Sequence, residues 1–276
     1  MEIETLSYDK SNPNYIMFKL KDSNPAFANA LRRILLMEIP VLAIDEVIIL
    51  ENTTPLYDEI IAHRLGLLPI STPPGEFNLR EECVCEGHGC TQCEISLNLE
   101  KESELMGEIE TVFSGEFVPE DPKVAPVIEN VPILRMTGGQ KITVQAIARL
   151  GLGKRHAKWQ ASIVTYQYDP IISIDNSKNS NWDEVIKYCP PQILEAKDGK
   201  TLKVTDPTAC ILCGLCAEKA PSKSVTVETN GKDFIFRVTS LGQMSVLDFL
   251  DQALNVLKAK AEELKDKLGT ISVPDE

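Results

Sequence analysis

Cysteine is the residue whose spacing is most informative about chemistry in this 276-residue sequence, because eight cysteines fall into two groups. Met1–Lys10 carries scattered charges and no apolar core, and no run approaches the ~20 apolar residues that span a bilayer. We therefore expect a cytoplasmic protein, with no membrane contact, whose reduced thiols bind a metal or a cluster. The cysteines are Cys83, Cys85, Cys90, Cys93, Cys189, Cys210, Cys213 and Cys216.

The second group predicts an iron-sulfur cluster. Cys210, Cys213 and Cys216 have the C-x2-C-x2-C spacing of bacterial ferredoxins, although Ala220 replaces the cysteine that precedes proline in that pattern. In two-cluster ferredoxins such a triplet takes its fourth ligand from a distant Cys-Pro pair, and Cys189 fits this role. The four residues therefore predict one 4Fe-4S cluster, with a 3Fe-4S cluster as a variant. A structural zinc on the same thiolates is the alternative.

The first group packs four thiols into the short segment 83–93. Gly87 and Gly89 permit the sharp loop that converging ligands require. Four thiolates form a closed tetrahedral site, so we expect a structural zinc that stabilises the fold and performs no catalysis. A pair of disulfides, an empty loop, and His88 in place of one thiolate are the alternatives.

The chain is acidic, since 41 Asp and Glu residues against 28 Lys and Arg residues give a formal net charge of −13. Such a chain lacks a sequence-independent grip on phosphates, so DNA must be held by partners. The compact basic patch Lys154–Trp159 is interpreted as a protein contact with Trp159 as a stacking surface. Gly151 and Gly153 lack the third glycine of a dinucleotide fingerprint, and no nucleophile-base motif occurs. We expect no catalytic residue.

The first elements are predicted by periodicity and by helix boundary residues. Residues 15–20 and 41–50 are rich in apolar and β-branched residues and predict strands. Between them, a helix is expected to begin at Pro25 and to end before Pro40. Its apolar face is formed by Phe27, Leu31, Ile34 and Leu35.

A second helix is predicted after Thr54-Pro55 and ends at Gly66, followed by a short strand at 67–70. Turn residues and alternating runs then predict a mostly β region between Ser71 and about Asp169. Further strands are expected at 142–150, 161–168 and within 224–238.

The last element has the clearest periodicity in the sequence. Ser245 and Asp248 form a variant of the capping box, and Gly269 ends the helix. The heptad-like seam favours packing against a long helix of a partner chain, with an internal core face as the alternative. The seam consists of Leu247, Leu250, Leu254, Leu257, Ala261, Leu264 and Leu268.

Six motifs stand out near the N-terminus: Asn29–Pro40, Ala43–Asp45, Asn52, Pro55, Asp58–Glu59 and His63–Pro69. Together they closely resemble the signature of the D subunit of archaeal RNA polymerase. That family includes the N-terminal domain of the bacterial alpha subunit and the third-largest subunit of eukaryotic RNA polymerase II. The resemblance continues through His156–Trp159 to the C-terminal helix, and so covers the chain almost end to end.

The resemblance implies an α+β fold with an alpha-like dimerisation domain built from both chain ends, residues 1–50 and 224–276. It also implies two inserted domains. One is mostly β, comprises residues 51–168 and contains the zinc-type loop 83–93. The other is a ferredoxin-like iron-sulfur domain at residues 169–223.

The resemblance further implies a non-catalytic assembly subunit of DNA-directed RNA polymerase, which is a nucleotidyltransferase. Such a subunit pairs with subunit L, gathers the small subunits N and P and docks the large catalytic subunits; DNA is contacted only through the assembled polymerase. The residues implied at the heterodimer face are Phe27, Leu31, Ile34, Leu35, Leu247, Leu250, Leu254 and Leu257. Those implied at contacts with the large subunits are Arg32, Arg33, Asp58, Glu59 and Arg64.

Two other functions stay open on the sequence alone. A ferredoxin-like electron-transfer subunit of an oxidoreductase complex would use the cluster to pass electrons to a docked partner. A stand-alone zinc protein that binds nucleic acid is opposed by the negative charge of the chain.

Overall fold

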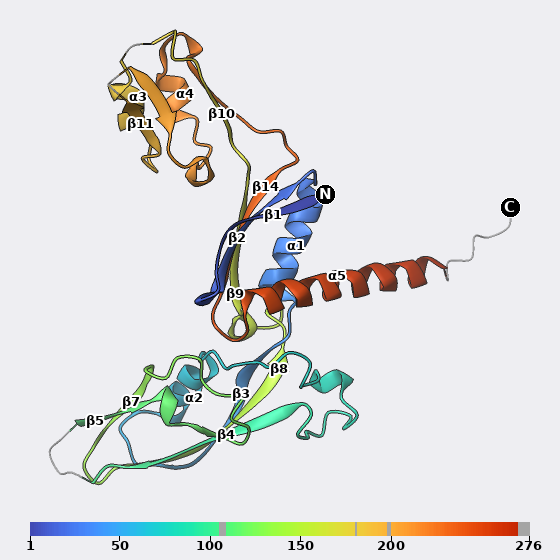
Figure 1. Cartoon of the computed structure of the whole chain (residues 1–276). Coiled ribbons are helices and arrows are strands. Elements are labelled where there is room, and N and C mark those ends of the chain that lie inside the picture. Colours follow the sequence, from blue (N-terminus) through green and yellow to red (C-terminus); the bar gives the residue numbers. More distant parts are fainter. Residues whose placement is uncertain (105–108, 180, 198–199, 270–276) are drawn as a thin grey trace. The chain divides into compact units, whose positions relative to one another are not determined.

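The structure is a computed structural model that describes residues 1–104, 109–179, 181–197 and 200–269 (Figure 1). Two compact units divide the chain, and each is assembled from three segments. Unit 1 comprises residues 1–8, 16–30 and 165–237, and unit 2 comprises residues 9–15, 31–164 and 238–276. Helices and sheets are mixed along the chain, which confirms the expected α+β class.

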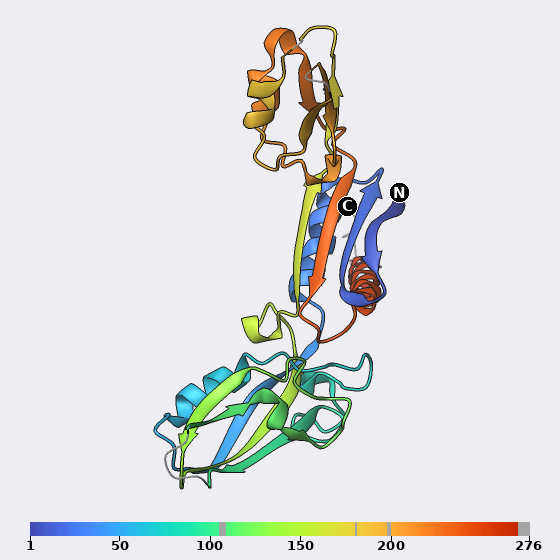
Figure 2. The ribbon, with the colours of Figure 1, turned by 60° about the vertical axis from the view of Figure 1, so that its left-hand side comes forward.

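Strands from both chain ends and one strand from the middle of the chain form a four-stranded sheet of order β1-β2-β14-β9, in which Figure 2 shows β14 between β2 and β9. Alternation of buried and partly exposed residues made β2 predictable, whereas β1 was missed because its side chains are mostly exposed. Aromatic rings link neighbouring strands: Phe18 stacks on Phe236 at 5.1 Å between centroids, and Tyr166 on Phe236 at 5.4 Å. The strands are β1 (Glu2–Asp9), β2 (Asn12–Lys21), β9 (Ser162–Tyr168) and β14 (Phe234–Ser240).

Helix α1 (Pro25–Met37) follows β2, as predicted. Asn24 caps it, because its Oδ1 accepts a hydrogen bond from the backbone N–H of Phe27 at 2.9 Å. The apolar residues Leu31, Ile34 and Leu35 are buried, with 5%, 3% and 1% of their surfaces exposed. This face of the helix therefore belongs to the core of the chain itself.

A second four-stranded sheet, of order β3-β8-β4-β6, lies in unit 2 and is antiparallel throughout. Strand β3 pairs with β8 along almost its whole length, with a register shift between Ile44 and Glu46 that leaves Asp45 at an irregularity. Strands β5 and β7 form a separate ribbon. The strands are β3 (Val41–Asn52), β4 (Glu94–Glu102), β5 (Ile109–Phe113), β6 (Val118–Pro119), β7 (Pro132–Thr137) and β8 (Lys141–Gly151).

Helix α2 (Asp58–Gly66) packs two buried residues, Ile61 and Leu65, into the core of these strands. The predicted helix start at Thr54 is wrong, because Oδ1 of Asn52 accepts hydrogen bonds from both the N–H and the hydroxyl of Thr54. The predicted strand at 67–70 is also wrong. Only Ile70 bridges to another segment, while the N–H groups of the two preceding leucines bond back into the helix. Short 3-10 helices occur at Arg80–Glu82, Ser114–Glu116 and Ala157–Trp159.

The segment with the second cysteine group has its own core in unit 1, built around Trp182. The ring N–H of Trp182 donates to the Lys200 carbonyl at 3.0 Å. Two antiparallel ribbons and two short helices surround this core. They are β10 (Ile171–Ile174) with β13 (Val225–Glu228), β11 (Leu194–Lys197) with β12 (Thr201–Val204), α3 (Asp183–Lys187) and α4 (Leu215–Lys219), and 3-10 helices lie at Pro207–Ala209 and Pro221–Lys223.

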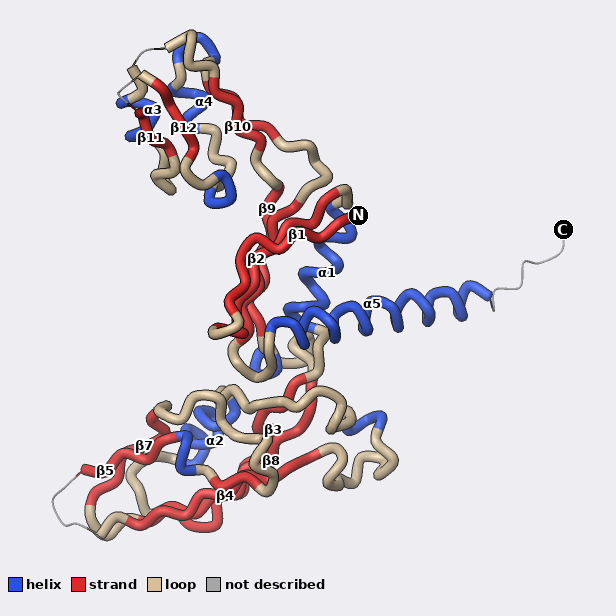
Figure 3. Tube along the Cα trace, in the orientation of Figure 1, coloured by secondary structure: helices blue, strands red, loops and turns tan. Residues whose placement is uncertain are grey.

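The last helix, α5 (Val246–Gly269), is continuous over 24 residues, as the periodicity predicted (Figure 3). Ser245 caps it, since its hydroxyl accepts from the N–H of Asp248 at 3.2 Å and donates to that carboxylate at 2.6 Å. The buried residues of the helix are Val246, Phe249 and Ala253, not the leucine seam, and residues 258–269 are exposed. Residues 270–276 of the expected dimerisation domain lie outside the described residues.

No helix in the described part of the chain has both the length and the apolar character that a membrane span requires.

Candidate functional site

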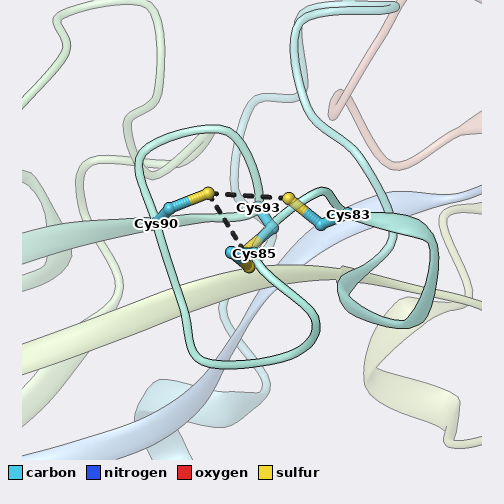
Figure 4. Close-up of side chains that lie close together, drawn as sticks. All are labelled: Cys83, Cys85, Cys90 and Cys93. Atoms are coloured by element: carbon cyan, nitrogen blue, oxygen red, sulfur yellow. Dashed lines mark hydrogen bonds between the residues drawn. The ribbon is translucent and has the colours of Figure 1, made fainter.

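The first cysteine group converges to a single point in the loop that precedes β4 (Figure 4). The Sγ atoms of Cys83 and Cys90 lie 3.5 Å apart, those of Cys85 and Cys93 3.6 Å, and those of Cys90 and Cys93 3.9 Å. All four sulfurs lie within 4.8 Å of one another. The four cysteine side chains therefore converge as expected, because one short loop carries all of them.

The spacing of the four sulfurs fits a tetrahedral ion. Zinc-sulfur bonds of about 2.3 Å place the four ligands of one zinc about 3.8 Å apart. A disulfide requires about 2.05 Å between sulfurs, so none of these pairs is bonded, and all eight cysteines are free thiols. His88 is exposed and lies outside the group of four. The thiols can therefore hold one metal ion, and the disulfide alternative is not realised.

The thiols of this group differ in how readily they lose a proton. Burial raises the pKa of Cys85, but the N–H groups of Gly89 and Gly87 and the neighbouring thiols outweigh it and lower that pKa to about 6. Burial and the thiols of Cys85 and Cys90 raise the pKa of Cys93 to about 12. Four sulfurs at this spacing cannot all be thiolates without a positive ion, and a divalent metal would deprotonate them together.

Two glycines shape the loop, as the sequence indicated. Gly87 and Gly89 have φ angles of +84° and +92°, a region that residues with a Cβ rarely adopt. The carbonyl of Gly87 accepts a hydrogen bond from Nε of Arg80 at 2.8 Å. At Gly89 a Cβ would lie 2.3 Å from Oε1 of Glu94, so the backbone passes directly against that carboxylate.

The second cysteine group lines one pocket in unit 1. Cys189 follows α3, and Cys210 and Cys213 precede α4, which carries Cys216. Cys213 is exposed and the other three are buried. The pocket is completed by Ile172, Pro191, Ile193, Leu194, Ile211, Gly214 and Val227.

Two left-handed residues shape the loop around this pocket. Leu212 and Gly214 have φ angles of +57° and +73°, and these two left-handed residues wrap the chain around the pocket. Within the described residues, the first group alone brings such ligand atoms within 4.8 Å of one another. The cysteines of the second group therefore share a pocket, but no three of their sulfurs all lie within 4.8 Å of one another. Burial raises the pKa of Cys210 and Cys216, and the other cysteines of the group add to it.

Arg149 on β8 forms an ionic network that the sequence did not suggest. It is 9% exposed and contacts three carboxylates: Glu94 at 2.9 Å, Glu46 at 2.9 Å and Asp45 at 3.4 Å. Lys158 binds Asp45 on its other oxygen at 2.5 Å. Since Glu94 directly follows the last cysteine of the first group, the network fastens the end of that loop to β3 and β8. No motif could have revealed it, because the partners lie far apart in sequence.

The basic patch Lys154–Trp159 is not an open stacking surface. Trp159 is 6% exposed, its ring N–H donates to the carbonyl of Arg149 at 3.1 Å, and Lys158 covers the ring face at 4.3 Å. A Cβ on Gly151 would lie 2.3 Å from this ring. Gly151 therefore makes room for a tryptophan, which explains the glycine without any nucleotide.

The residues expected at a heterodimer face separate into two classes. Leu31, Ile34 and Leu35 of α1 are buried within the chain, so they are not available to a partner, and Phe27 is half-buried. On α5, Leu247 and Leu254 are 46% and 52% exposed. Leu250 and Leu257 are half-buried.

The polar residues expected at contacts with large subunits lie on α1 and α2. Arg33 is exposed and Arg32 is half-buried, while Asp58 and Glu59 form the exposed first turn of α2. Asp58 accepts a hydrogen bond from the Asn52 amide at 2.6 Å. Arg64 donates to the carbonyl of Ile133 at 2.6 Å and lines an open groove with Pro55, Leu56, Pro132, Leu134 and Arg135.

Comparison with known proteins gives consistent relatives. The family model for the RNA polymerase Rpb3/RpoA insert domain matches residues 44–177. DNA-directed RNA polymerase subunit Rpo3 of Archaeoglobus fulgidus is 40% identical over 251 residues, which cover 90% of this chain and 92% of the relative. Rpo3 of Methanosphaera stadtmanae is 35% identical and Rpo3 of Methanosarcina acetivorans 34% identical, each over 267 residues that cover 96% of this chain and 97% of the relative.

Proposed function

The chain belongs to the Rpo3 family of DNA-directed RNA polymerase subunits, and on that premise we propose that it is a non-catalytic assembly subunit of an archaeal RNA polymerase in the cytoplasm. The observation that carries this proposal is the 40% identity to an Rpo3 subunit across 90% of the chain. In this role the chain corresponds to the D subunit. It organises other polymerase subunits and contacts DNA only through them.

We propose that helix α5 packs against a helix of a partner chain, and that this partner is subunit L. Leu247 and Leu254 expose 46% and 52% of their surfaces although they are large and apolar, and half-buried Leu250 and Leu257 belong to the same seam. Covering them would bury apolar area that water now contacts. Half-buried Phe27 of α1 is a further proposed contact with the partner, whereas Leu31, Ile34 and Leu35 are already buried within the chain.

For the large catalytic subunits we propose the surfaces that carry Arg32, Arg33, Asp58, Glu59 and Arg64. The two acidic residues and Arg64 come from one short helix, so a partner would meet both signs of charge within three turns. Such an arrangement favours specific orientation more than affinity. The small subunits N and P complete the proposed assembly.

The two cysteine groups have separate structural roles in this proposal. Cys83, Cys85, Cys90 and Cys93 would hold zinc, supported by sulfur distances of 3.5–3.9 Å. Cys189, Cys210, Cys213 and Cys216 would hold one 4Fe-4S cluster, supported by their shared apolar pocket. When bound, each group supplies cross-links among thiolates that keep the surrounding loops folded.

The domain boundaries expected from the sequence lie at residues 50, 168 and 224. The pairing of the strands favours a different position for each of them. Strand β3 shares its sheet with β8 and β4, so the mostly β domain would begin at Val41. Strand β9 joins β14, which would return residues 162–168 to the dimerisation domain. Strand β13 pairs with β10, so the ferredoxin-like domain would extend to Glu228.

Co-expression with the small alpha-like subunit tests the proposed helix face. Leu254→Asp places a charge on the exposed seam and should abolish recovery of the pair, because the charge would be buried against the partner. Asn255→Asp is the matched control, since it adds the same charge at an adjacent exposed position. Pairing that survives Leu254→Asp would remove α5 from the proposed interface.

Reconstitution with the large subunits tests the role of the cluster. Cys213→Ser removes a ligand at an exposed position, so the fold outside the pocket should persist. We expect retained pairing with the small subunit, loss of bound iron and poorer recovery of the full polymerase. Equal recovery of polymerase from wild type and variant would count against a structural cluster, and a wild-type protein with zinc but no iron would exclude the cluster.

A further inference from the structure

Two side chains of the sheet β1-β2-β14-β9 contact the loop that carries the second cysteine group. Gln167 lies on β9 and Arg237 on the neighbouring strand β14. The amide Nε2 of Gln167 donates to the carbonyls of Thr208 at 3.1 Å and Cys210 at 3.0 Å. Arg237 donates through Nη2 to the carbonyl of Thr208 at 2.6 Å. All four residues belong to unit 1.

The two side chains also hold each other. Nη1 of Arg237 donates to Oε1 of Gln167 at 3.1 Å, which turns the Nε2 group of the glutamine toward the loop carbonyls. Neither side chain is fully exposed, so water competes with these bonds less than it would on an open surface. A guanidinium supplies several donors in a fixed planar arrangement, which suits it to hold a carbonyl and an amide oxygen at once.

The loop is stiff where it is held. Oδ1 of Asp206 accepts from the N–H of Thr208 at 2.9 Å and from its hydroxyl at 2.6 Å. The N–H of Cys210 donates to the carbonyl of Pro207 at 3.1 Å. This turn ends at Cys210. Hydrogen bonds to its carbonyls therefore also restrain the position of Cys210, the first cysteine of the triplet.

We propose that Arg237 and Gln167 are positioning residues for the second metal centre, fixing the Cys210 end of the ligand loop to strands β9 and β14. The inference rests on the proposed function of these cysteines as ligands. The positions of these cysteines then depend both on the core of their own segment and on the strands β9 and β14. Coupling of this kind is reciprocal, so an occupied centre also stabilises the end of the sheet.

Release of iron to a colorimetric chelator tests the proposal on the anaerobically purified full-length chain. Arg237→Met keeps an unbranched apolar stem and removes both hydrogen bonds of the guanidinium, and Gln167→Glu removes both donations to the loop. Each should release iron roughly tenfold faster than wild type, as expected for the loss of bonds of this strength. Arg237→Lys retains one donor and should lie between. Lys203→Met is the control, because it removes a positive charge from an exposed position of the same segment and should release iron at the wild-type rate.

Amide hydrogen exchange gives a second readout that does not depend on release kinetics. Removing iron from wild type should accelerate exchange in β9 and β14 and leave β3 and β8 of unit 2 unchanged. In the double variant Arg237→Met with Gln167→Glu, which lacks all three hydrogen bonds from the sheet to the loop, removing iron should change exchange in β9 and β14 little.

Equal iron release from wild type, Arg237→Met and Gln167→Glu overturns the positioning role and leaves the cluster proposal intact. Zinc found on these thiols would exclude the cluster but not the positioning role. The positioning role would then be tested by comparing zinc release from the same variants. A wild-type protein with no metal on Cys189, Cys210, Cys213 and Cys216 overturns both proposals.

Discussion

Replacing Gly89 with alanine should destabilise the first cysteine loop much more than the same change at Gly87. Both glycines have positive φ angles, +92° and +84°. A Cβ at Gly87 meets no atom within 4 Å, whereas a Cβ at Gly89 would lie 2.3 Å from Oε1 of Glu94. Glu94 cannot simply move aside, because Nε of Arg149 donates to its other oxygen at 2.9 Å.

The two variants therefore differ by one identifiable interaction. Alanine in the left-handed region costs about 1–2 kcal/mol, so we expect Gly87→Ala to lower the free energy of unfolding by that amount. Gly89→Ala bears the same cost and also displaces Glu94 from a buried guanidinium, a bond to a charged group that contributes about 1.5–3 kcal/mol. The total expected for Gly89→Ala is about 2.5–5 kcal/mol.

Urea unfolding followed by tryptophan fluorescence measures this difference. The chain has two tryptophans, so a Trp182→Phe background leaves Trp159 as the reporter for unit 2. Adding Glu94→Ala to Gly89→Ala removes the atom that the new Cβ meets, and the two changes together should cost less than their sum. Equal losses for the two alanine variants, or strict additivity with Glu94→Ala, would refute the steric argument.

Three further predictions concern unit 2. Gly151→Ala places a Cβ 2.3 Å from the buried ring of Trp159 and should lower the free energy of unfolding by about 1–3 kcal/mol, measured in urea. Burial raises the pKa of Asp45, but Lys158 outweighs it and holds that pKa below its usual 3.8. Because this pKa is lower in the folded than in the unfolded state, the contribution of Asp45 to the free energy of unfolding is complete above about pH 4 and declines as the pH falls further. Asp45→Asn should therefore make the free energy of unfolding depend less on pH in this acid range, as measured by urea titrations at successive pH values. Chelation of metal from loop 83–93 should open that loop to proteolysis, and an unchanged digestion pattern would show that the loop needs no ion.

Much of the local structure follows from the sequence, because the responsible interactions span only a few residues. Asn24 and Ser245 begin their helices through bonds to N–H groups three residues on, and these caps were visible as residue types at the right spacing. The convergence of Cys83–Cys93 follows in the same way from a short loop with two glycines. In the second group only Cys210, Cys213 and Cys216 are close in sequence, and Cys189 joins their pocket from 21 residues upstream.

The tertiary structure decided which of the predicted surfaces remain exposed. Periodicity placed Leu31 and Leu254 alike on apolar helix faces, yet the first is buried and the second is half exposed. A pattern along one helix shows that a face is apolar and does not show what covers it. That information resides in the packing of strands and helices from distant parts of the chain.

The tertiary structure also decided how charged and polar side chains pair. Arg149 meets Asp45 across 104 positions of sequence, and Arg237 meets Gln167 across 70. Neither pair has a motif, because long-range contacts arise from strand order and register, which depend on the whole chain. The sequence alone determined how the cysteines group and where α1 and α5 begin, whereas the scaffold around the cysteines depended on packing that no local spacing encodes.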